Sequence, residues 1–288
     1  MKVLLLGSSG MLGKSMYNFL SNDFKIYTNG LRMRKYDLCQ KNNLLILLNN
    51  SKPNVIINSS GITNIEICEK NKKLAKKINA EVLKNLFELK KKYNHKFWVI
   101  QISTDQMYDS ASPKKNFSEK SKTKINNYYT KTKLEAERTC KKNKSLILRT
   151  NFFGKSTTHK KSFSDWILQQ MRGNKLFYLF KDVYFSPLRM ISICKIVKKI
   201  LLNDFGKTGI YNLGSKNGLS KLKFSLIFSN YLKIKNNNYR AININKVLKI
   251  KRSRNMLMNV EKFENSFKIR LPDLRSEIKD EINENYLS

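Results

Sequence analysis

The sequence is poor in the residues that build metal sites and disulfides. Among its 288 residues there are only four cysteines and two histidines. The cysteines lie far apart without a Cys-x-x-Cys pair, at positions Cys39, Cys68, Cys140 and Cys194. This spacing excludes a disulfide framework and most zinc sites, and we expect no bound metal. Because neither His95 nor His159 stands in a recognisable setting, a Ser-His-Asp site is not a leading interpretation either.

Long hydrophobic runs are also absent. The longest apolar stretches, such as Val3–Leu6 and Leu44–Leu48, fall far short of the roughly 20 residues that a membrane-spanning helix needs. Lys2 and the apolar residues after it resemble the start of a signal peptide, but the glycines from Gly7 to Gly13 interrupt that pattern. We therefore predict a cytoplasmic protein that does not act at a membrane.

Acidic residues are scarce. The 21 Asp and Glu stand against 57 Lys and Arg, which gives a formal net charge of +36. Such an excess is typical of proteins that bind nucleic acid or anionic lipid. The lysines are, however, spread over the whole chain, together with many asparagines. We interpret the charge as a solvated basic surface that attracts anionic small molecules, and we do not expect nucleic-acid binding as the main role.

Apolar and aromatic residues are plentiful, and the 16 Phe and 13 Tyr argue against a disordered chain. In the first 150 residues short apolar runs alternate with helical patterns. We expect strands at Val3–Leu6, Phe24–Thr28, Asn54–Asn58, Phe97–Ser103 and Leu146–Arg149, and helices at Met11–Leu20, Leu44–Asn50, Leu74–Lys92 and Tyr129–Cys140. This alternation predicts an α/β fold with a doubly wound parallel sheet.

Beyond about Asn151 the pattern becomes mixed. We expect helices at Phe163–Met171, Ser192–Leu202 and Leu219–Leu232, and strands at Leu176–Phe180, Ile210–Leu213 and Ala241–Asn245. The chain therefore divides into a first domain, residues 1–150, and a smaller α+β domain, residues 151–288. We expect elements near residues 185–214 to return to the first domain.

A glycine-rich loop, Gly7-Ser8-Ser9-Gly10-Met11-Leu12-Gly13, follows the first strand and opens a helix. Glycines permit a tight turn and let the backbone approach phosphate groups. The exposed N–H groups and the positive end of the helix dipole then bind a pyrophosphate. The loop predicts a dinucleotide site.

A P-loop is the alternative interpretation, because Gly13-Lys14-Ser15 matches the end of that motif. The P-loop pattern requires a further glycine at position 8, where this chain has Ser8. Gly7 comes one residue too early, so the dinucleotide interpretation is preferred.

The stretch after the second strand bears on the choice of cofactor. It lacks an acidic residue that would hold a ribose 2′-hydroxyl, and Arg32, Arg34 and Lys35 follow instead. Such cations favour a 2′-phosphate, which predicts NADPH over NADH. Asp37 either reaches the adenine amino group or acts as a loop or cap residue, and the sequence leaves both interpretations open.

Tyr129 and Lys133 lie four residues apart on an expected helix, so their side chains share a face. A lysine beside a phenol stabilises the phenolate, which makes the tyrosine a proton donor to a carbonyl. Tyr231 and Lys235 have the same spacing, so context must select the pair. The position of Thr104 favours Tyr129 and Lys133, because Thr104 ends the fourth strand at the carboxyl edge of the sheet, where ligands of open α/β sheets bind.

Seven motifs together resemble those of the extended short-chain dehydrogenase/reductases, and within them the dTDP-4-dehydrorhamnose reductase group. Beside the glycine loop these are Asn58–Thr63, Ile102–Asp105, Tyr129–Leu134, Leu148–Gly154, Phe185–Pro187 and Arg252–Asn255. The likeness covers essentially the whole chain and is more specific in its first half.

The resemblance implies a Rossmann-type fold, with an NAD(P)-binding domain in residues 1–150 and a domain mainly for the nucleotide-sugar substrate in residues 151–288. It implies an NAD(P)H-dependent reductase of the 4-keto group of a nucleotide-activated deoxysugar, in surface polysaccharide biosynthesis. It implies Thr104, Tyr129 and Lys133 as the catalytic set. Cofactor contacts are expected from Gly7, Gly10, Met11, Leu12, Arg32, Asp37, Leu38, Gly61, Ile62, Thr63, Tyr129 and Lys133. Substrate contacts are expected from Thr104, Asp105, Phe152, Arg252 and Arg254.

The chain departs from the family pattern in places. Arg252-Ser253-Arg254 lacks the expected proline, and Phe185 stands where the family often has glycine. Gln106 stands where the related 4,6-dehydratases have glutamate, which favours reduction over dehydration. An epimerase on the same fold and a non-catalytic sugar-nucleotide-binding subunit are the alternatives, and a homodimer is compatible with the sequence.

Overall fold

The computed structural model describes residues 1–30, 36–112, 115–235 and 237–287. The chain forms two compact units. The first comprises Met1–Thr104, Asn127–Leu148 and Cys194–Tyr211, and the second comprises Asp105–Asn126, Arg149–Ile193 and Asn212–Ser288. The segment Asp105–Asn126 is thus an excursion of the chain into the second unit, between two segments of the first unit. A single boundary near residue 150 does not describe this division.

The first unit is built on a six-stranded sheet with the strand order β10-β5-β4-β3-β1-β2. The strands are β1 (Lys2–Leu6), β2 (Lys25–Thr28), β3 (Val55–Asn58), β4 (Trp98–Thr104), β5 (Leu146–Thr150) and β10 (Gly209–Leu213). β1 pairs in parallel with β2 and β3, and β3 pairs in parallel with β4. Every residue of β3, β4 and β5 is buried, as expected for strands covered on both faces. The predicted α/β fold is confirmed.

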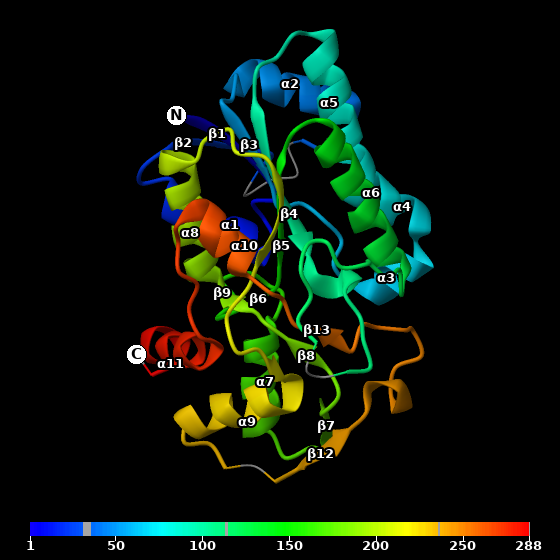
Figure 1. Ribbon diagram of the computed structural model, residues 1–288, viewed down its shortest axis with the longest axis vertical. Coiled ribbons are helices and arrows are strands. Elements are labelled where there is room, and N and C mark those ends of the chain that lie inside the picture. The colour runs from blue at the N-terminus through cyan, green and yellow to red at the C-terminus, as the bar shows by residue number, and fades with distance from the viewer. Residues whose placement is uncertain (31–35, 113–114, 236, 288) are drawn as a thin grey trace. The chain divides into compact units, whose positions relative to one another are not determined.

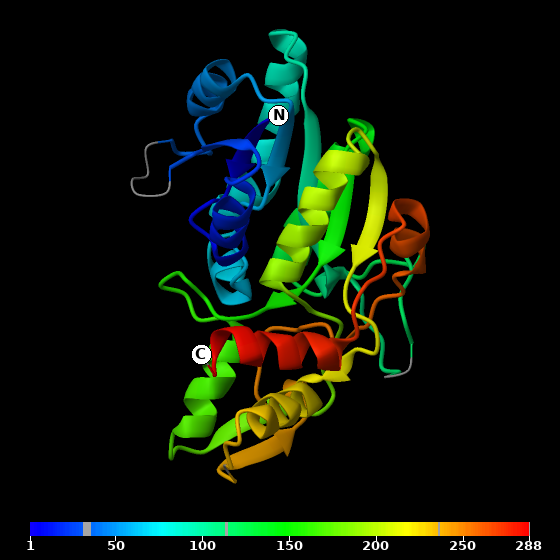
Figure 2. The same ribbon diagram turned by 90° about the vertical axis from the view of Figure 1, so that its left-hand side faces the viewer.

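Helices cover both faces of this sheet. Figure 1 shows α1 (Met11–Leu20) and α8 (Met190–Asn203) on one side, and α5 (Val82–Lys92) and α6 (Tyr128–Lys142) on the other. In Figure 2 α1 and α8 lie in front of the strands. α2 (Lys41–Ser51) packs on α5, and one apolar cluster joins α2, α5 and α6 to the strands. The sheet is therefore doubly wound.

The connection between β3 and β4 differs from the expected single helix over residues 74–92. It contains α3 (Ile65–Lys70), α4 (Lys72–Lys76), a π-helical turn (Lys77–Glu81) and α5. The side chain of Asn71 accepts a hydrogen bond from the N–H of Leu74 and so starts α4. The first two helices are too short to show an apolar period, which is why the sequence pattern missed α3 and the break.

The second unit contains three small sheets, β11-β8-β13, β12-β7 and β6-β9. Its strands are β6 (Phe152–Phe153), β7 (Phe177–Phe180), β8 (Tyr184–Phe185), β9 (Leu188–Arg189), β11 (Leu219–Ser220), β12 (Tyr239–Ile242) and β13 (Asn255–Met256). Its helices are α7 (Phe163–Arg172), α9 (Lys221–Tyr231), α10 (Glu261–Phe267) and α11 (Leu274–Asn285). The second unit is thus an α+β structure, as the mixed sequence pattern predicts, and its aromatic core includes Phe153, Phe224 and Phe228.

The helix expected over residues 219–232 begins only at Lys221. Leu219 and Ser220 pair with β8, and the hydroxyl of Ser220 caps the helix by accepting from the N–H of Lys223. The cap residue therefore sets the boundary, as serine commonly does.

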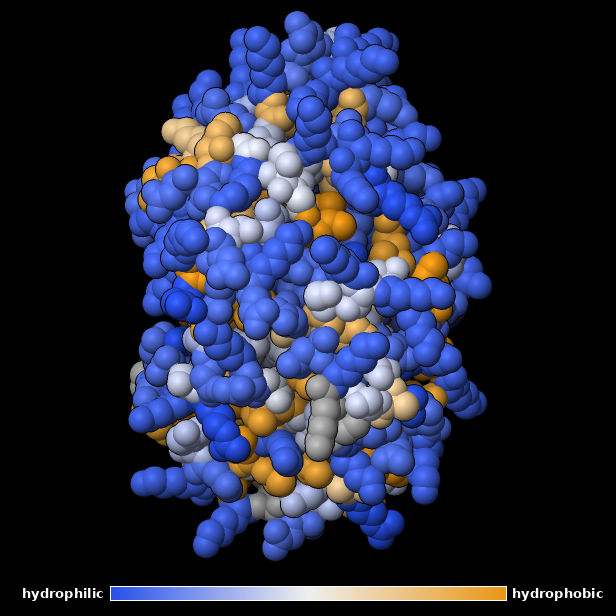
Figure 3. All heavy atoms as spheres, viewed as in Figure 1, coloured by the Kyte–Doolittle hydropathy of each residue, from blue (hydrophilic) through white to orange (hydrophobic). Residues whose placement is uncertain are grey.

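Hydrophilic side chains cover most of the face shown in Figure 3, and apolar side chains there form small separate patches. Within the described ranges, no helix combines the length and the apolar character that crossing a bilayer requires.

Candidate active site

The glycine loop between β1 and α1 packs so closely that side chains are excluded from two of its positions. Gly7 has φ +83°, and a Cβ there would lie 2.5 Å from the backbone nitrogen of Ser60. A Cβ on Gly13 would lie 2.1 Å from the carbonyl oxygen of Gly7. Both distances are far below van der Waals contact, so the turn and the packing of α1 require glycine at these two positions.

The start of α1 is suited to hold a phosphate group. Its N-cap is Gly10, no side chain caps it, and its first turn contains no acidic residue. The N–H groups of Met11 and Leu12 at this end are therefore not covered by a capping side chain. The hydroxyl of Ser8 is buried and has no hydrogen-bond partner within the described ranges. These features fit the diphosphate of a dinucleotide cofactor.

The residues expected on the adenosine side have structural contacts of their own. One carboxylate oxygen of Asp37 accepts a hydrogen bond of 2.9 Å from the N–H of Cys39, so Asp37 acts as a loop cap. The side chain of Leu38 is buried in the core beneath α2 and α5. Arg32, with Arg34 and Lys35, lies outside the described residues.

The loop after β3, Gly61-Ile62-Thr63, is held by a residue that the sequence patterns did not single out. Asn79, in the π-helical turn, accepts a hydrogen bond of 2.7 Å from the N–H of Ile62 and donates one of 3.1 Å to its carbonyl. It also donates one of 3.0 Å to the hydroxyl of Thr132 on α6. Asn79 therefore links the loop to the helix that carries Tyr129 and Lys133. Its clue in the sequence is slight, a single polar residue on the apolar side of a helical segment.

The helix α6 places Tyr129 and Lys133 on its buried side, where they are 7% and 5% exposed. Asn127 caps this helix by accepting from the N–H of Thr130. The ammonium group of Lys133 donates a hydrogen bond of 2.8 Å to the carbonyl oxygen of Ile102 in β4. Thr104, 5% exposed, follows two residues later on the same face of that strand. The structure thus brings Lys133, on the buried side of α6, to the last residues of β4, as the sequence predicts.

A buried carboxylate sets the charge environment of Lys133. Burial lowers the pKa of Lys133 to about 8, and the nearby charge of Glu137 opposes this shift. Glu137 is 3% exposed and accepts a hydrogen bond of 2.6 Å from the hydroxyl of Ser103. Tyr129, Lys133 and Glu137 follow one another at four-residue steps, which is the signal that could have identified Glu137 from the sequence.

In the second unit Asp105 is fully buried and its carboxylate accepts a hydrogen bond of 2.9 Å from the side chain of Asn151. Phe152 is half-buried and pairs with Leu188 through β6 and β9. Phe185, which departs from the family pattern, is a core residue whose ring contacts Phe224.

Hydrogen bonds anchor the segment Arg252–Asn255 to the excursion after Thr104. The hydroxyl of Ser253 donates a hydrogen bond of 2.6 Å to the carbonyl of Gln106. The N–H of Arg254 donates one of 2.9 Å to the carboxylate of Asp109. Burial raises the pKa of Asp109, but the hydrogen bonds it accepts, that of Arg254 first, lower it overall. These contacts explain why the excursion belongs to the second unit.

Lys221, at the start of α9, is a further cation of this unit that sequence reasoning missed. Its ammonium group lies 4.9 Å from the ring centre of Phe163 and 5.9 Å from that of Phe185. Burial, together with the charge of Arg252, lowers the pKa of Lys221 to about 8, whereas Asp105 raises it. Arg252, Asp105 and Lys221 therefore interact electrostatically. In a chain with 57 Lys and Arg, nothing in the sequence marks this lysine.

A parallel doubly wound sheet, a glycine loop after its first strand and a buried Tyr-x-x-x-Lys helix beside its fourth strand define a Rossmann-type fold of the short-chain dehydrogenase/reductase class. The chain belongs to the family described as RmlD substrate binding domain, whose model matches residues 1–287.

Named relatives agree with this assignment. The chain is 25% identical over 232 residues to a dTDP-4-dehydrorhamnose reductase of Aggregatibacter actinomycetemcomitans, an alignment that covers 78% of this chain and 77% of the relative. A dTDP-4-dehydrorhamnose reductase structure from Clostridium acetobutylicum superposes with a TM-score of 0.87 at 23% identity, covering 98% of this chain and 99% of the other. One from Bacillus anthracis in complex with NADP also gives 0.87, at 19% identity, covering 99% and 100%. At these identities the two structures establish the shared fold.

Proposed function

We propose that the protein is an NAD(P)H-dependent reductase that acts on the 4-keto group of a nucleotide-activated deoxysugar, as the name of its relatives, dTDP-4-dehydrorhamnose reductase, suggests. The observation that carries the proposal is the placement of Tyr129 and Lys133. They lie on the buried side of α6, and the ammonium group of Lys133 contacts β4 next to Thr104. The proposal gives Tyr129 the role of proton donor.

The chain's own residues supply acid catalysis. The hydroxyl of Tyr129 donates a proton to the substrate oxygen as the carbonyl is reduced, and the positive charge of Lys133 stabilises the phenolate that is left. The hydroxyl of Thr104 donates a hydrogen bond to the same oxygen. A bound nicotinamide cofactor would supply the hydride.

The cofactor would be held by the glycine loop and by the loop after β3. The N–H groups at the start of α1, with Gly7, Gly10, Met11 and Leu12, suit its diphosphate, and Gly61, Ile62 and Thr63 suit its nicotinamide side. The basic stretch after β2 favours NADPH over NADH. Equilibrium titration with both cofactors checks this preference.

The second unit would bind the nucleotide sugar. Phe152 lies against the sugar in this proposal, and Asp105 is a further polar contact. Arg252 and Arg254 bind the diphosphate, because guanidinium groups match phosphate oxygens in paired hydrogen bonds. Lys221, which interacts electrostatically with Arg252, adds a third positive charge suited to the same group.

Substitution of the two arginines tests this assignment. Arg252→Ala and Arg254→Ala are each expected to raise the KM for the nucleotide sugar about tenfold or more, since a hydrogen bond to a charged group contributes about 1.5–3 kcal/mol. The KM for NADPH should be unchanged. Arg240→Ala, at an exposed position on β12, is the matched control. If both variants keep the wild-type KM for the sugar, the diphosphate is bound elsewhere.

The pH dependence of turnover tests the role of Glu137. Glu137→Gln keeps an acceptor for Ser103 but removes the charge that raises the pKa of Lys133, so that pKa should fall further below about 8. Lys133 then loses its proton at lower pH, and the alkaline decline of kcat should move down by about one pH unit. Glu135→Gln on the same helix is the control. A profile of Glu137→Gln that overlays the wild type would show that this carboxylate does not set the charge of Lys133.

The experiment that tests the proposed function uses purified protein, NADPH and a panel of nucleotide-activated 4-keto sugars. Oxidation of NADPH together with a reduced sugar product supports the reductase. Conversion of a sugar nucleotide without net NADPH consumption would indicate an epimerase, and binding without any conversion would indicate a non-catalytic subunit.

A further inference from the structure

A cavity of about 620 Å³ lies in the first unit, at the edge of the sheet opposite to the glycine loop. Trp98 lines it at the start of β4, whereas Thr104 ends the same strand. A strand rises about 3.3 Å per residue, so the two ends of β4 are roughly 20 Å apart. The cavity is therefore separate from the candidate active site.

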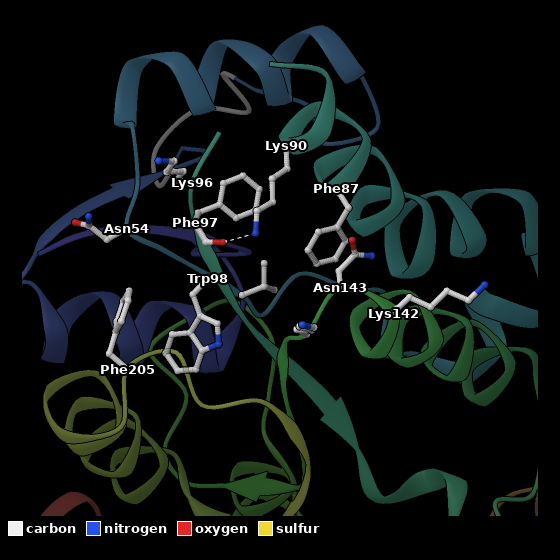
Figure 4. Close-up of a pocket in the computed structure, with 11 residues that line it drawn as sticks. Asn54, Phe87, Lys90, Lys96, Phe97, Trp98, Lys142, Asn143 and Phe205 are labelled. Atoms are coloured by element: carbon white, nitrogen blue, oxygen red, sulfur yellow. Dashed lines mark hydrogen bonds between the residues drawn. The ribbon is translucent and has the colours of Figure 1, made fainter. Parts of the chain in front are cut away.

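Aromatic rings form part of the wall of this cavity. Figure 4 shows Phe97 and Trp98 from the start of β4, Phe87 from α5, and Phe205 beside Trp98. The rings of Trp98 and Phe205 lie 5.3 Å apart and are tilted by 59°. Phe205 is 51% exposed, and the buried indole N–H of Trp98 has no acceptor within the described ranges. Trp98 itself is only 8% exposed, so the ring of Phe205 is the flat apolar surface that this wall offers.

Lysines supply the charge of the cavity, and none of the described residues that line it is acidic. Lys90 already has a partner within the protein, because its ammonium group donates a hydrogen bond of 2.7 Å to the carbonyl of Phe97. Lys96, Lys142 and Lys144 are exposed and form no ion pair within the described ranges. The positive charges of these lysines are therefore not balanced by carboxylates among the described residues that line the cavity.

A second groove shows that this imbalance is not general in a lysine-rich chain. That groove, of about 420 Å³, is lined by Lys76 and Lys84 but also by Glu81, Glu88 and Glu135. Its lysines are balanced by carboxylates, and no aromatic residue lines it. The combination of rings with several unbalanced lysines therefore distinguishes the cavity at Trp98 from this second groove.

Helix capping does not account for all of these lysines. Lysines in the last turn of a helix offset the negative end of its dipole, and this explains Lys90 in α5 and Lys142 in α6. Lys96 and Lys144 lie beyond the ends of these helices, in the loops that lead into β4 and β5. Their positive charges face the cavity without such a role.

We propose that this cavity is a second, non-catalytic binding site for a nucleoside phosphate. The base stacks on the exposed ring of Phe205, which packs against Trp98, and Lys96 and Lys144 bind the phosphate groups. Stacking of a base on an aromatic side chain contributes about 1–3 kcal/mol. The volume lies within the usual range of about 300–1,000 Å³ for sites of single small ligands, which favours a mononucleotide over a nucleic-acid strand.

Fluorescence of Trp98 provides the test. The chain has two tryptophans, so Trp166→Phe leaves Trp98 as the only one. Titration of this full-length variant with ADP is expected to quench its fluorescence with saturation, and adenosine should bind at least tenfold more weakly. Adding Lys96→Glu and Lys144→Glu should weaken ADP binding at least tenfold, whereas Lys84→Glu in the second groove should not. Titration with ADP-glucose distinguishes a free nucleotide from a nucleotide sugar as the ligand.

Activity measurements separate this site from the active site. The variant with Lys96→Glu and Lys144→Glu should keep the wild-type kcat and KM for NADPH. Absence of quenching by ADP, equal affinity for adenosine, or quenching that survives both charge reversals would overturn the proposal. So would tighter binding of a short single-stranded oligoadenylate than of ADP, because it would point to nucleic acid.

Discussion

Replacing Tyr129 by phenylalanine is expected to lower kcat by about 10²–10⁴, the usual contribution of a positioned general acid. The substitution removes only the hydroxyl and keeps the ring, so cofactor affinity should change little. The expectation depends on the location of Tyr129, which is buried on α6 on the same side as Lys133, whose ammonium group contacts β4. Steady-state kinetics with NADPH and the keto sugar measure the effect.

Two other tyrosines serve as matched controls. Tyr128 is the preceding residue of the same helix, and its ring lies near the ammonium groups of Lys72 and Lys131. Tyr231 has a lysine four residues later, as Tyr129 does, but is 40% exposed. Tyr128→Phe and Tyr231→Phe should stay within a few-fold of wild type. If one of these two variants loses turnover while Tyr129→Phe keeps it, then Tyr129 is not the proton donor.

Lys133→Met should act differently from Tyr129→Phe. It removes the charge that stabilises the phenolate, and it also removes a group that would reach the nicotinamide ribose in the proposed complex. We therefore expect both a lower kcat and a weaker affinity for NADPH, so that the two substitutions are distinguished by cofactor binding.

Replacing Arg189 by methionine is expected to destabilise the second unit by about 3–5 kcal/mol. The side chain of Arg189 is 3% exposed, and its guanidinium group donates a hydrogen bond of 3.0 Å to the carboxylate of Glu281. It also pairs with Glu284. Its backbone N–H donates 2.7 Å to Glu277. Removal of the arginine leaves the buried carboxylates of Glu277 and Glu281 without their counter-charge, and unfolding in urea measures the cost.

The pH dependence of this loss follows from the direction of the shifts. Burial raises the pKa of Glu277 and that of Glu281, while Arg189 opposes both shifts. A carboxyl group whose pKa is raised by folding adds stability at low pH, and this stability is lost as the pH rises through the folded value. Without Arg189 both pKa values rise further. The difference between wild type and Arg189→Met should therefore grow from mildly acidic to mildly alkaline pH.

Arg275→Met is the matched control, because Arg275 lies exposed on α11, the helix that carries Glu277 and Glu281. Its effect should stay within about 0.5 kcal/mol. A loss of stability for Arg189→Met that is equally small, or that shrinks as the pH rises, would show that the arginine does not neutralise these carboxylates.

The features that local sequence determines were predictable. Buried strands such as Val55–Asn58 read as nearly continuous apolar runs, and the glycine loop identified the start of the first helix. The spacing of Tyr129 and Lys133 indicated a shared helix face, and the structure shows both residues buried there. In each case the pattern and the structure depend on residues close together in the chain.

The features that depend on distant partners were not predictable. Asn79 holds the loop at Ile62 and contacts Thr132, 53 residues away. Lys221 becomes notable only when Phe163 and Phe185 surround its ammonium group, and Arg189 only when Glu281, 92 residues later, accepts its hydrogen bond. In a chain with this many lysines, one lysine or arginine has no distinguishing local signal.

The transfer of hydride to the sugar is the central claim, and isotope labelling tests it most directly. NADPH that carries deuterium at the transferable position of its nicotinamide ring is incubated with the purified protein and dTDP-4-dehydrorhamnose. We expect one deuterium at carbon 4 of the sugar for each NADPH oxidised, and a loss of this transfer in Tyr129→Phe. A product without deuterium at carbon 4, or no oxidation of NADPH at all, would contradict this claim.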